Sequence, residues 1–246
     1  MNLLLSLRER AKAESFNPRL LGLFLNPSHI IRRSLRQAIK EQSRLIEGRV
    51  LDFGCGSKPY EALFTRATAY IGADILVSGH EHTESKVDFF YDGNSLPFAD
   101  KEFDAVVSFE VFEHIFNLPQ VLPEISRVTR DSGYLLISIP FAWGEHEVPY
   151  DFARYTSFGI SHLLQNHGYE IVSLRKTTTS FLAICQLFIS YLESIAPKNR
   201  LGWLLFLLCL SLPCTTLAYA LNRVLPKRDA LFCNTVVLAR KVTHRE

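Results

Sequence analysis

The sequence lacks the marked excess of basic residues that nucleic-acid-binding proteins usually carry. It has 27 lysine and arginine residues against 25 acidic residues, which gives a net charge of +2 at pH 7. Cysteine is scarce: the five residues form no Cys-x-x-Cys pair, and their odd number fits no disulfide framework. No cleavable signal peptide is evident at the start. We therefore expect a cytoplasmic protein that binds no nucleic acid.

Between residues 48 and 176, short apolar runs alternate with stretches of helical periodicity. Alternation of this kind favours a parallel sheet with helices on both faces. The apolar runs are RVLDFG, AYIGADI, KVDFFYD, FDAVVSFE and GYLLISIP, followed by YEIVSLRK at 169–176 and LFCNTVVLAR at 231–240. The sequence therefore predicts an α/β protein with a seven-stranded, mostly parallel sheet.

The segments around these strands are predicted to be mainly helical. Residues 1–47 have helical spacing with a break at 26–28, and Gly48 is expected to end this helix. The opening MNLLLSLRER predicts a short amphipathic helix. Further helices are expected at 119–129 and from Ser157 to Gly168. The predicted divisions are a helical region at 1–47, a core at 48–176, an insert at 177–230, and a last strand with its tail at 231–246.

The densest signal is the segment VLDFGCGSKPY at 50–60, in which a buried strand runs into two glycines and then a predicted helix. Gly54 and Gly56 allow a tight turn and a close approach of the backbone to a ligand. A dinucleotide is one alternative ligand, but its fingerprint needs glycine or alanine where this chain has Pro59. Asp52 instead suits a positively charged ligand.

Two further acids follow the next strands. Asp74 ends the second strand about 20 residues on, where a carboxylate can accept hydrogen bonds from both ribose hydroxyls. Asp92 follows the third strand and is placed to meet an adenine edge. Each acid alone is more often a plain strand-end residue. Their order along the chain, after the two glycines, indicates a ligand that contains a nucleoside.

The region 48–176, with the last strand, resembles the class I methyltransferase family, close to the small bacterial members that share the type-11 methyltransferase domain. The resemblance implies S-adenosylmethionine as the cofactor and a seven-stranded sheet whose last strand is antiparallel. The cofactor-site residues that we carry over are Asp52, Gly54, Cys55, Gly56, Asp74, Ile75, Asp92, Gly93 and Glu110. Lys58 departs from the family pattern, which frequently has a third glycine at this position. The departure affects the expected fine geometry of the loop.

Two interpretations compete for the segment EVFEH at 110–114. In one, Glu110 closes the cofactor pocket, while Glu113 and His114 begin a helix. In the other, these residues bind a divalent cation together with His146. The segment is similar to that of the metal-assisted O-methyltransferases of ubiquinone synthesis and of small-RNA 2′-ends. Because many relatives without a metal share the Glu-His pair, we assign no metal ligand.

The segment PYDFARYT at 149–156 also has two interpretations. Its structural role is to cap the next helix through Thr156 or Ser157, with its aromatic side chains packed beneath. Its functional role is to form a wall of the acceptor pocket, with His146 as general base and Arg154 orienting a polar or anionic group. One segment can have both roles. The predicted catalytic residues are His146, His114, Glu113 and Arg154.

About 54 residues, 177–230, separate the sixth and seventh strands. Residues 177–192 carry no charge over 16 positions, and residues 201–222 carry none over 22, although Pro213 is expected to interrupt the second stretch. Since both strands join one sheet, the insert makes either no membrane span or two. A re-entrant or interfacial helical hairpin fits these lengths, and flanking cations favour an anionic lipid surface. The alternative is a helical lid or dimer face buried against protein.

Together these features predict an S-adenosylmethionine-dependent methyltransferase, peripheral on the cytoplasmic face of a membrane. The expected acceptor is a hydrophobic or lipid-linked small molecule, and O-methylation is favoured. One alternative is a non-catalytic scaffold anchored through the insert, and another is a metal-assisted O-methyltransferase. The intact glycine loop and the ordered acids argue against the scaffold. Nothing in the sequence indicates an oligomeric state.

Overall fold

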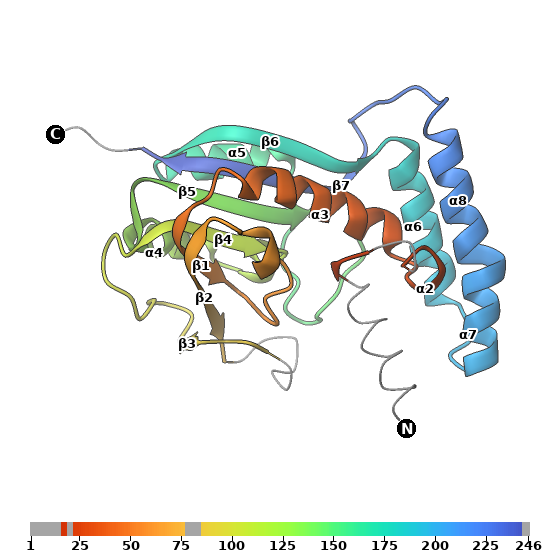
Figure 1. Cartoon of the computed structure of the whole chain (residues 1–246), viewed down its shortest axis with the longest axis horizontal. Helices are drawn as coiled ribbons and strands as arrows, with labels where there is room; N and C mark the ends of the chain where they lie inside the picture. Colours follow the sequence, from red (N-terminus) through yellow and green to blue (C-terminus); the bar gives the residue numbers. More distant parts are fainter. Residues whose placement is uncertain (1–15, 19–21, 77–84, 243–246) are drawn as a thin grey trace. The chain divides into compact units, whose positions relative to one another are not determined.

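The computed structural model describes residues 16–18, 22–76 and 85–242 (Figure 1). The amphipathic helix predicted from MNLLLSLRER lies outside these residues. Within them, Ala38–Arg175 and 235–242 form one compact unit, the sheet unit. Lys176–Asn234 and the described residues up to Gln37 form the other, the hairpin unit. The boundaries predicted at 47, 176 and 230 divide the sequence into consecutive segments, and they stay a prediction.

A single seven-stranded sheet has the order β3-β2-β1-β4-β5-β7-β6 (Figure 1). Its strands are β1 (Gly48–Phe53), β2 (Ala67–Ile75), β3 (Phe89–Tyr91), β4 (Phe103–Phe109), β5 (Thr129–Pro140), β6 (Tyr169–Thr179) and β7 (Phe232–Lys241). Strands β1 to β5 pair in parallel. The N–H of Val242 donates to Gly168 beyond one end of β6, and that of Ser180 donates to Leu231 beyond the other. Strand β7 is therefore antiparallel to β6, and the predicted fold class is confirmed.

Helices α4 (Leu118–Val128) and α5 (Ser157–Asn166) pack on the sheet through apolar side chains. Buried members of this core are Leu51, Phe53, Val106, Leu135 and Ile137 from the strands, with Leu118, Leu122, Ile125, Ile160 and Leu164 from the helices. The Thr156 hydroxyl accepts a hydrogen bond from the N–H of Gly159 at 3.0 Å, which makes Thr156 the predicted N-cap of α5. This core fixes the carboxyl ends of β4 and β5, from which the candidate catalytic segments extend.

The helix before the sheet differs from the prediction at one end. The break at 26–28 is confirmed, since α2 (Gly22–Leu25) ends before it and α3 (His29–Ser43) begins after it. Gly48 was expected to end the helix, but α3 ends at Ser43 and Gly48 is the first residue of β1. The N–H groups of Leu45 and Ile46 bond back to the last turn of α3 and close it earlier.

The helix expected after the glycine loop is replaced by a single short turn. Strand β2 already begins at Ala67, so the chain between β1 and β2 has room only for the 3₁₀ turn η1 (Glu61–Leu63). The Ser43 hydroxyl at the end of α3 donates to the Leu63 carbonyl at 2.9 Å. The end of α3 therefore lies against this connection.

The hairpin unit contains α6 (Phe181–Ser194) and a second helix built from α7 (Arg200–Phe206), η4 (Leu207–Ser211) and α8 (Leu212–Leu221). The expectation that Pro213 interrupts the second helix is wrong, because the helix is continuous over Arg200–Leu221, 22 residues. The π-helical turn η4 precedes the proline and makes room for its ring, which clashes with a regular helical turn. Among the described residues, this is the one helix with the length and composition to cross a membrane.

Helices α6 and α8 lie side by side (Figure 1). Ile189 of α6 and Ala218 of α8 pack together with Ile30 of α3. The amide of Gln186, fully buried, donates to the Pro27 carbonyl and accepts from the N–H of Ile31, each at 3.1 Å. These two hydrogen bonds satisfy a polar side chain within an otherwise apolar hairpin.

Gly72 of β2 provides a test of the packing beneath the glycine loop. A Cβ at this position would come within 2.5 Å of both Cys55 Sγ and Lys58 Cε. We predict that Gly72→Ala lowers the thermal unfolding midpoint by about 2–10 °C, measured by circular dichroism. Gly144→Ala is the matched control, since its Cβ would meet nothing within 4 Å. Equal midpoints for the two variants would contradict this packing.

Candidate active site

The glycine loop follows β1 and turns back over the end of β2. Gly54 and Gly56 have φ angles of +72° and +47°, which an L-residue rarely adopts. The N–H of Gly54 donates to the Ala73 carbonyl at 2.8 Å, and that of Gly56 donates to Asp74 Oδ2 at 2.9 Å. A Cβ on Gly56 would meet nothing within 4 Å. The backbone of the loop is therefore open to a ligand, as a cofactor cradle requires.

Two buried carboxylates lie under this loop. Asp52 accepts a hydrogen bond from the Tyr70 hydroxyl at 2.8 Å. Burial raises the pKa of Asp52 to about 7, although the Tyr70 hydrogen bond and the nearby Lys58 oppose the rise. Asp74 accepts from the N–H groups of Gly56 and Ile75. Burial likewise raises the pKa of the Cys55 thiol, so this residue stays uncharged beside the two acids. The arrangement is suited to a positively charged ligand.

Lys58 explains the departure from the family's third glycine. Its buried side chain crosses β2 at Gly72 and reaches Asp88 Oδ2 at 2.5 Å. The same oxygen accepts from the N–H of Gly72 at 2.7 Å, and the N–H of Lys86 donates to the Gly56 carbonyl at 2.8 Å. Lys58 thus ties the segment before β3 to the glycine loop. The sequence alone did not indicate this link.

The predicted adenine-side residues meet at the ends of β2 and β3. Asp92 is exposed, and its Oδ1 accepts from the N–H groups of Asn94 and Ser95 at 2.8 and 2.9 Å. A Cβ on Gly93 would lie 3.2 Å from Cδ1 of Ile75, so these two residues are neighbours. The structure therefore brings Ile75 and Gly93 together, and it places Asp92 at the surface as the residue that holds the turn.

Glu110 begins the segment after β4 with a left-handed φ of +56°. Its Oε1 accepts from the Ser138 hydroxyl at 2.7 Å, and its N–H donates to the Ser138 carbonyl at 2.9 Å. Both bonds tie Glu110 to the neighbouring strand β5. A Cβ on Gly54 would overlap Val111, which shows that this segment packs on the glycine loop. The predicted cofactor and catalytic residues are therefore neighbours in space.

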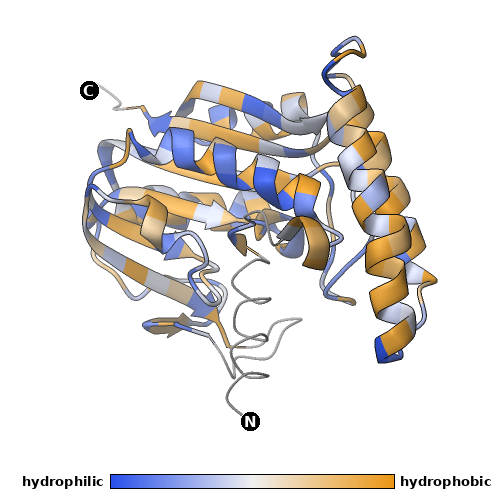
Figure 2. Ribbon diagram, turned by 45° about the vertical axis from the view of Figure 1, so that its right-hand side comes forward, coloured by the Kyte–Doolittle hydropathy of each residue, from blue (hydrophilic) through white to orange (hydrophobic). Residues whose placement is uncertain are grey.

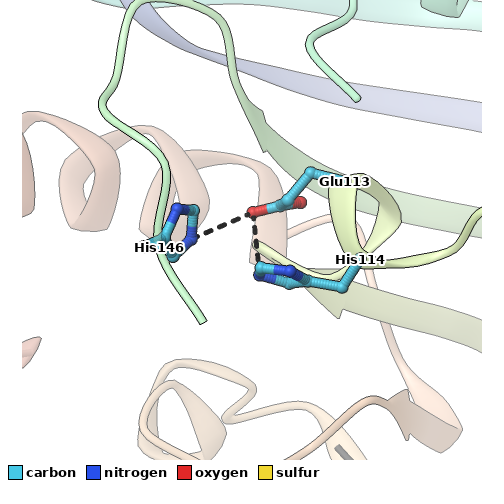
Figure 3. Close-up of side chains that lie close together, drawn as sticks. All are labelled: Glu113, His114 and His146. Carbon is cyan, nitrogen blue, oxygen red and sulfur yellow. Dashed lines mark ion pairs between the residues drawn. The ribbon is translucent and has the colours of Figure 1, made fainter. Parts of the chain in front are cut away.

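Glu113, His114 and His146 form a polar cluster at the carboxyl ends of β4 and β5 (Figure 3). Glu113 and His114 lie on the 3₁₀ turn η3 (Phe112–His114), and His146 lies on the segment after β5. Glu113 Oε1 is 3.7 Å from His114 Nε2 and 3.8 Å from His146 Nε2. The Glu113 side chain is 0% exposed, and neither oxygen has a hydrogen-bond partner within the described part of the chain. Burial, followed by the nearby Glu110, raises the pKa of Glu113 well above its ordinary value.

Hydrogen bonds on the far side of each ring orient the imidazoles. His114 Nδ1 lies 2.7 Å from the Tyr150 carbonyl. His146 Nδ1 lies 3.3 Å from the Gly144 carbonyl and 3.2 Å from Asp151 Oδ2. Since these neighbours are all acceptors, we assign the ring hydrogen to Nδ1 in both residues. Both Nε2 lone pairs then face the Glu113 carboxylate. Because burial raises the pKa of Glu113, either a proton on its carboxyl group or a cation between these three atoms would satisfy the cluster.

Asp151 was missed in the sequence, although its spacing from Arg154 was an available signal. Its carboxylate accepts from the N–H of His146 at 2.9 Å and from both Nη atoms of Arg154 at 2.5 and 2.6 Å. The Arg154 hydrogen bonds hold the pKa of Asp151 well below its usual range. Arg154 was expected to orient a polar or anionic group of the acceptor. In the structure its Nη atoms hold Asp151 against His146.

This geometry suits His146 as a base. Burial lowers the pKa of His146, so its ring is neutral at pH 7. Its Nε2 can accept a proton, and Asp151 beside Nδ1 can stabilise the imidazolium that forms.

Comparison with known proteins relates the chain to methyltransferases. The family profile described as methyltransferase domain matches residues 28–174, more than half of the chain. A fatty-acid O-methyltransferase of Mycolicibacterium smegmatis is 36% identical over 101 residues, 37% of each protein. A demethylmenaquinone methyltransferase of Mycobacterium marinum is 32% identical over 111 residues, 43% of this chain and 47% of the relative. The match thus spans less than half the length of either relative.

Solved structures share the fold at low sequence identity. The crystal structure of the cyclase SpnF has a TM-score of 0.54 and 19% identity, with 85% of this chain and 81% of SpnF covered. Phosphoethanolamine N-methyltransferase 2 of Haemonchus contortus, bound to S-adenosylmethionine, has a TM-score of 0.54 and 15% identity. That match covers 85% of this chain and 52% of the other. At these identities the likeness shows the fold alone.

The pKa of Asp52 predicts how S-adenosylmethionine binding depends on pH. Because the cofactor is positively charged at sulfur, it binds more tightly when Asp52 is ionised, which requires a pH above about 7. We predict that the dissociation constant rises by up to about tenfold for each pH unit below 7. Calorimetric titration from about pH 5.5 to about pH 8.5 measures this dependence. In Asp52→Asn we expect weaker binding of S-adenosylmethionine and no dependence of the dissociation constant on pH. A wild-type dissociation constant that is equally independent of pH would show that ionised Asp52 does not strengthen cofactor binding.

Proposed function

The chain belongs to the methyltransferase-domain family as an S-adenosylmethionine-dependent enzyme, and from this premise we propose that it methylates an oxygen atom of a hydrophobic acceptor at a membrane surface. The observation that carries the proposal is the polar cluster of Glu113, His114 and His146. A hydroxyl acceptor must lose its proton as it is methylated, and the Nε2 lone pair of His146 in this cluster can accept that proton. The carboxyl ends of parallel strands are also where ligands bind in sheets of this kind.

The residues of the glycine loop fit the cofactor. Gly56 leaves the backbone open, and the buried acids Asp52 and Asp74 offset a positive charge. When bound, S-adenosylmethionine supplies an electrophilic methyl group on a positively charged sulfur. His146 Nε2 accepts the proton of the acceptor hydroxyl, and Asp151 stabilises the resulting imidazolium.

The hydrophobic character of the acceptor has support from two sides. The relatives are named for fatty acids and demethylmenaquinone. The hairpin unit also exposes apolar side chains along both of its helices, and the ribbon of these helices is coloured largely as hydrophobic in Figure 2. These residues are Ile184, Phe188, Tyr191 and Ile195 near α6, with Leu201, Leu204, Leu205, Leu208 and Leu217 on the second helix. Such a surface gains free energy in a lipid environment.

The lengths of the two helices favour an interfacial position. Helix α6 has 14 residues and is about 21 Å long, short of the roughly 30 Å of a bilayer core. Since β6 and β7 are neighbours in one sheet, the hairpin enters and leaves on the same side. Basic residues near its ends suit an anionic, cytoplasmic leaflet. These residues are Lys176, Lys198, Arg200, Arg223, Lys227 and Arg228.

We predict that His146→Gln lowers kcat at least about 100-fold and leaves the dissociation constant of S-adenosylmethionine within about threefold. The measurement is transfer of labelled methyl groups to a lipid extract, with mass spectrometry of the product. His162→Gln is the matched control, because His162 is exposed on α5. A methyl group on nitrogen or carbon, or full activity in His146→Gln, would overturn the proposal. So would the absence of any transfer by a protein that binds the cofactor.

A second candidate function is metal-assisted O-methylation. The ligand atoms of Glu113, His114 and His146 lie within 4.8 Å of one another, and each imidazole donates its other N–H to a backbone carbonyl or a carboxylate. Metal-bound histidines characteristically have such partners. A divalent cation would also neutralise the buried Glu113 carboxylate. The assignment of no metal from sequence stays a prediction.

Adding a metal ion distinguishes metal-assisted O-methylation from O-methylation in which His146 acts as the base without a metal. If a cation belongs to the cluster, adding Zn²⁺, Mn²⁺ or Mg²⁺ to chelator-treated protein raises the unfolding midpoint by several degrees, and Glu113→Gln removes the effect. The activity of the chelated wild type would then fall and return with the metal. Unchanged activity after chelation, with no metal-dependent midpoint, would leave His146 acting as a base without a cation.

The membrane proposal predicts charge-dependent lipid binding. We expect the full chain to sediment with vesicles that contain about 30% phosphatidylserine, and to do so less with pure phosphatidylcholine. Replacing Arg223, Lys227 and Arg228 together by glutamine lowers the bound fraction on anionic vesicles, because each cation near the surface contributes about 1 kcal/mol. Absence of binding to either vesicle by folded protein would count against membrane contact and favour a lid or dimer face.

A further inference from the structure

Three exposed aromatic side chains, Phe116, Tyr150 and Phe152, form a row beside the polar cluster. Their exposed fractions are 76%, 37% and 45%. The rings of Phe116 and Phe152 lie edge to face with centroids 5.5 Å apart, and those of Tyr150 and Phe152 with centroids 6.5 Å apart. These side chains come from two segments, one after β4 and one after β5. We call them the aromatic row.

Backbone hydrogen bonds attach the aromatic row to the polar cluster. The N–H of Phe152 donates to the Glu113 carbonyl at 2.9 Å, and that of Ala153 does so at 3.2 Å. The Tyr150 carbonyl accepts from His114 Nδ1 at 2.7 Å. The backbone that carries Tyr150 and Phe152 is therefore tied to Glu113 and His114 of the polar cluster. An exposed apolar surface that leads to a polar cluster fits a molecule with a ring or chain at one end and a polar group at the other.

The charges at the cluster select the polar group of that molecule. The oxygens of the buried Glu113 carboxyl group have no hydrogen-bond partner among the described residues, and Glu147 Oε2 lies 3.9 Å from His114 Nε2. The Nη atoms of Arg154 are bound to Asp151. A carboxylate acceptor would bring a negative charge into surroundings where burial already disfavours the charged form of Glu113. A neutral hydroxyl would instead donate its hydrogen to an Nε2 lone pair.

We propose that the acceptor is a neutral aromatic hydroxyl compound, a phenol or hydroquinone with an apolar substituent. Its ring packs against Phe116 and Phe152, and its hydroxyl donates to His146 Nε2. Aromatic rings in edge-to-face contact favour another ring over an aliphatic chain of similar area. The inference rests on the proposed O-methylation, and it excludes fatty acids as the preferred acceptors.

The test compares three ligands that differ in one property each. Para-hexylphenol has the ring and a neutral hydroxyl, para-hexylbenzoate has the same ring with a negative charge, and dodecanol has a neutral hydroxyl without a ring. Each is titrated by calorimetry into the full chain saturated with S-adenosylhomocysteine, so that no turnover is needed. We expect para-hexylphenol to bind at least about tenfold more tightly than either of the others.

Variants of the aromatic row locate the binding. Phe116→Ala and Phe152→Ala each raise the dissociation constant of para-hexylphenol about tenfold. Phe158→Ala, which removes a phenylalanine that is 84% exposed on α5, leaves it unchanged. Equal or tighter binding of para-hexylbenzoate or dodecanol overturns the inference, as does no binding of para-hexylphenol or an equal effect of all three variants.

The outcome is separable from that of the proposed function. O-methylation of a fatty acid or an aliphatic alcohol in the lipid extract would overturn the aromatic acceptor and leave O-methylation standing. A product methylated on nitrogen or carbon would overturn both.

Discussion

The chemistry of this site depends on one buried carboxyl group, that of Glu113, whose oxygens have no hydrogen-bond partner in the part of the chain that the structure describes. Glu113 is fully buried, and its Oε1 lies 3.7 and 3.8 Å from the Nε2 atoms of His114 and His146, whose ring hydrogens we assign to Nδ1. A charged carboxylate in such surroundings is costly unless a proton or a cation accompanies it. The fold maintains this arrangement through backbone hydrogen bonds from Phe152 and Ala153 to Glu113. A ligand that supplies a hydrogen-bond donor or a positive charge would satisfy the Glu113 oxygens.

The glycine loop also lies over buried acidic groups that a ligand can satisfy, in this case the cofactor. Asp52 and Asp74 are buried under a backbone that leaves open space at Gly56. Lys58 offsets part of their charge and ties the loop to Asp88. Because acids outnumber cations in this network, a positively charged ligand completes it. The contact between Gly54 and Val111 joins this half of the site to the segment that carries Glu113. The glycine loop, which favours a positively charged ligand, and the polar cluster, which favours a hydrogen-bond donor or a cation, therefore follow neighbouring strands.

Much of this could be predicted from the sequence, because the signals were local. Strand periodicity, the two glycines and the acids at strand ends depend on residues within a few positions of each other. The prediction of a helix after the glycine loop was wrong, because the short connection between β1 and β2 leaves room for one turn only. The prediction that Pro213 interrupts the second helix of the hairpin was also wrong, because a π-helical turn before the proline accommodates its ring. The Lys58–Asp88 link and the Asp151–His146 contact depend on tertiary proximity, which a single sequence does not contain.

For His146 to act as the base, the cofactor must present its reactive end to the polar cluster of Glu113, His114 and His146. A crystal structure of the full chain with S-adenosylhomocysteine measures this directly. We expect the cofactor sulfur to lie within about 7 Å of His146 Nε2, with an open approach for an acceptor between them. A sulfur atom that faces away from the cluster, or a cluster shielded from it by protein, would rule out His146 as the base for methyl transfer.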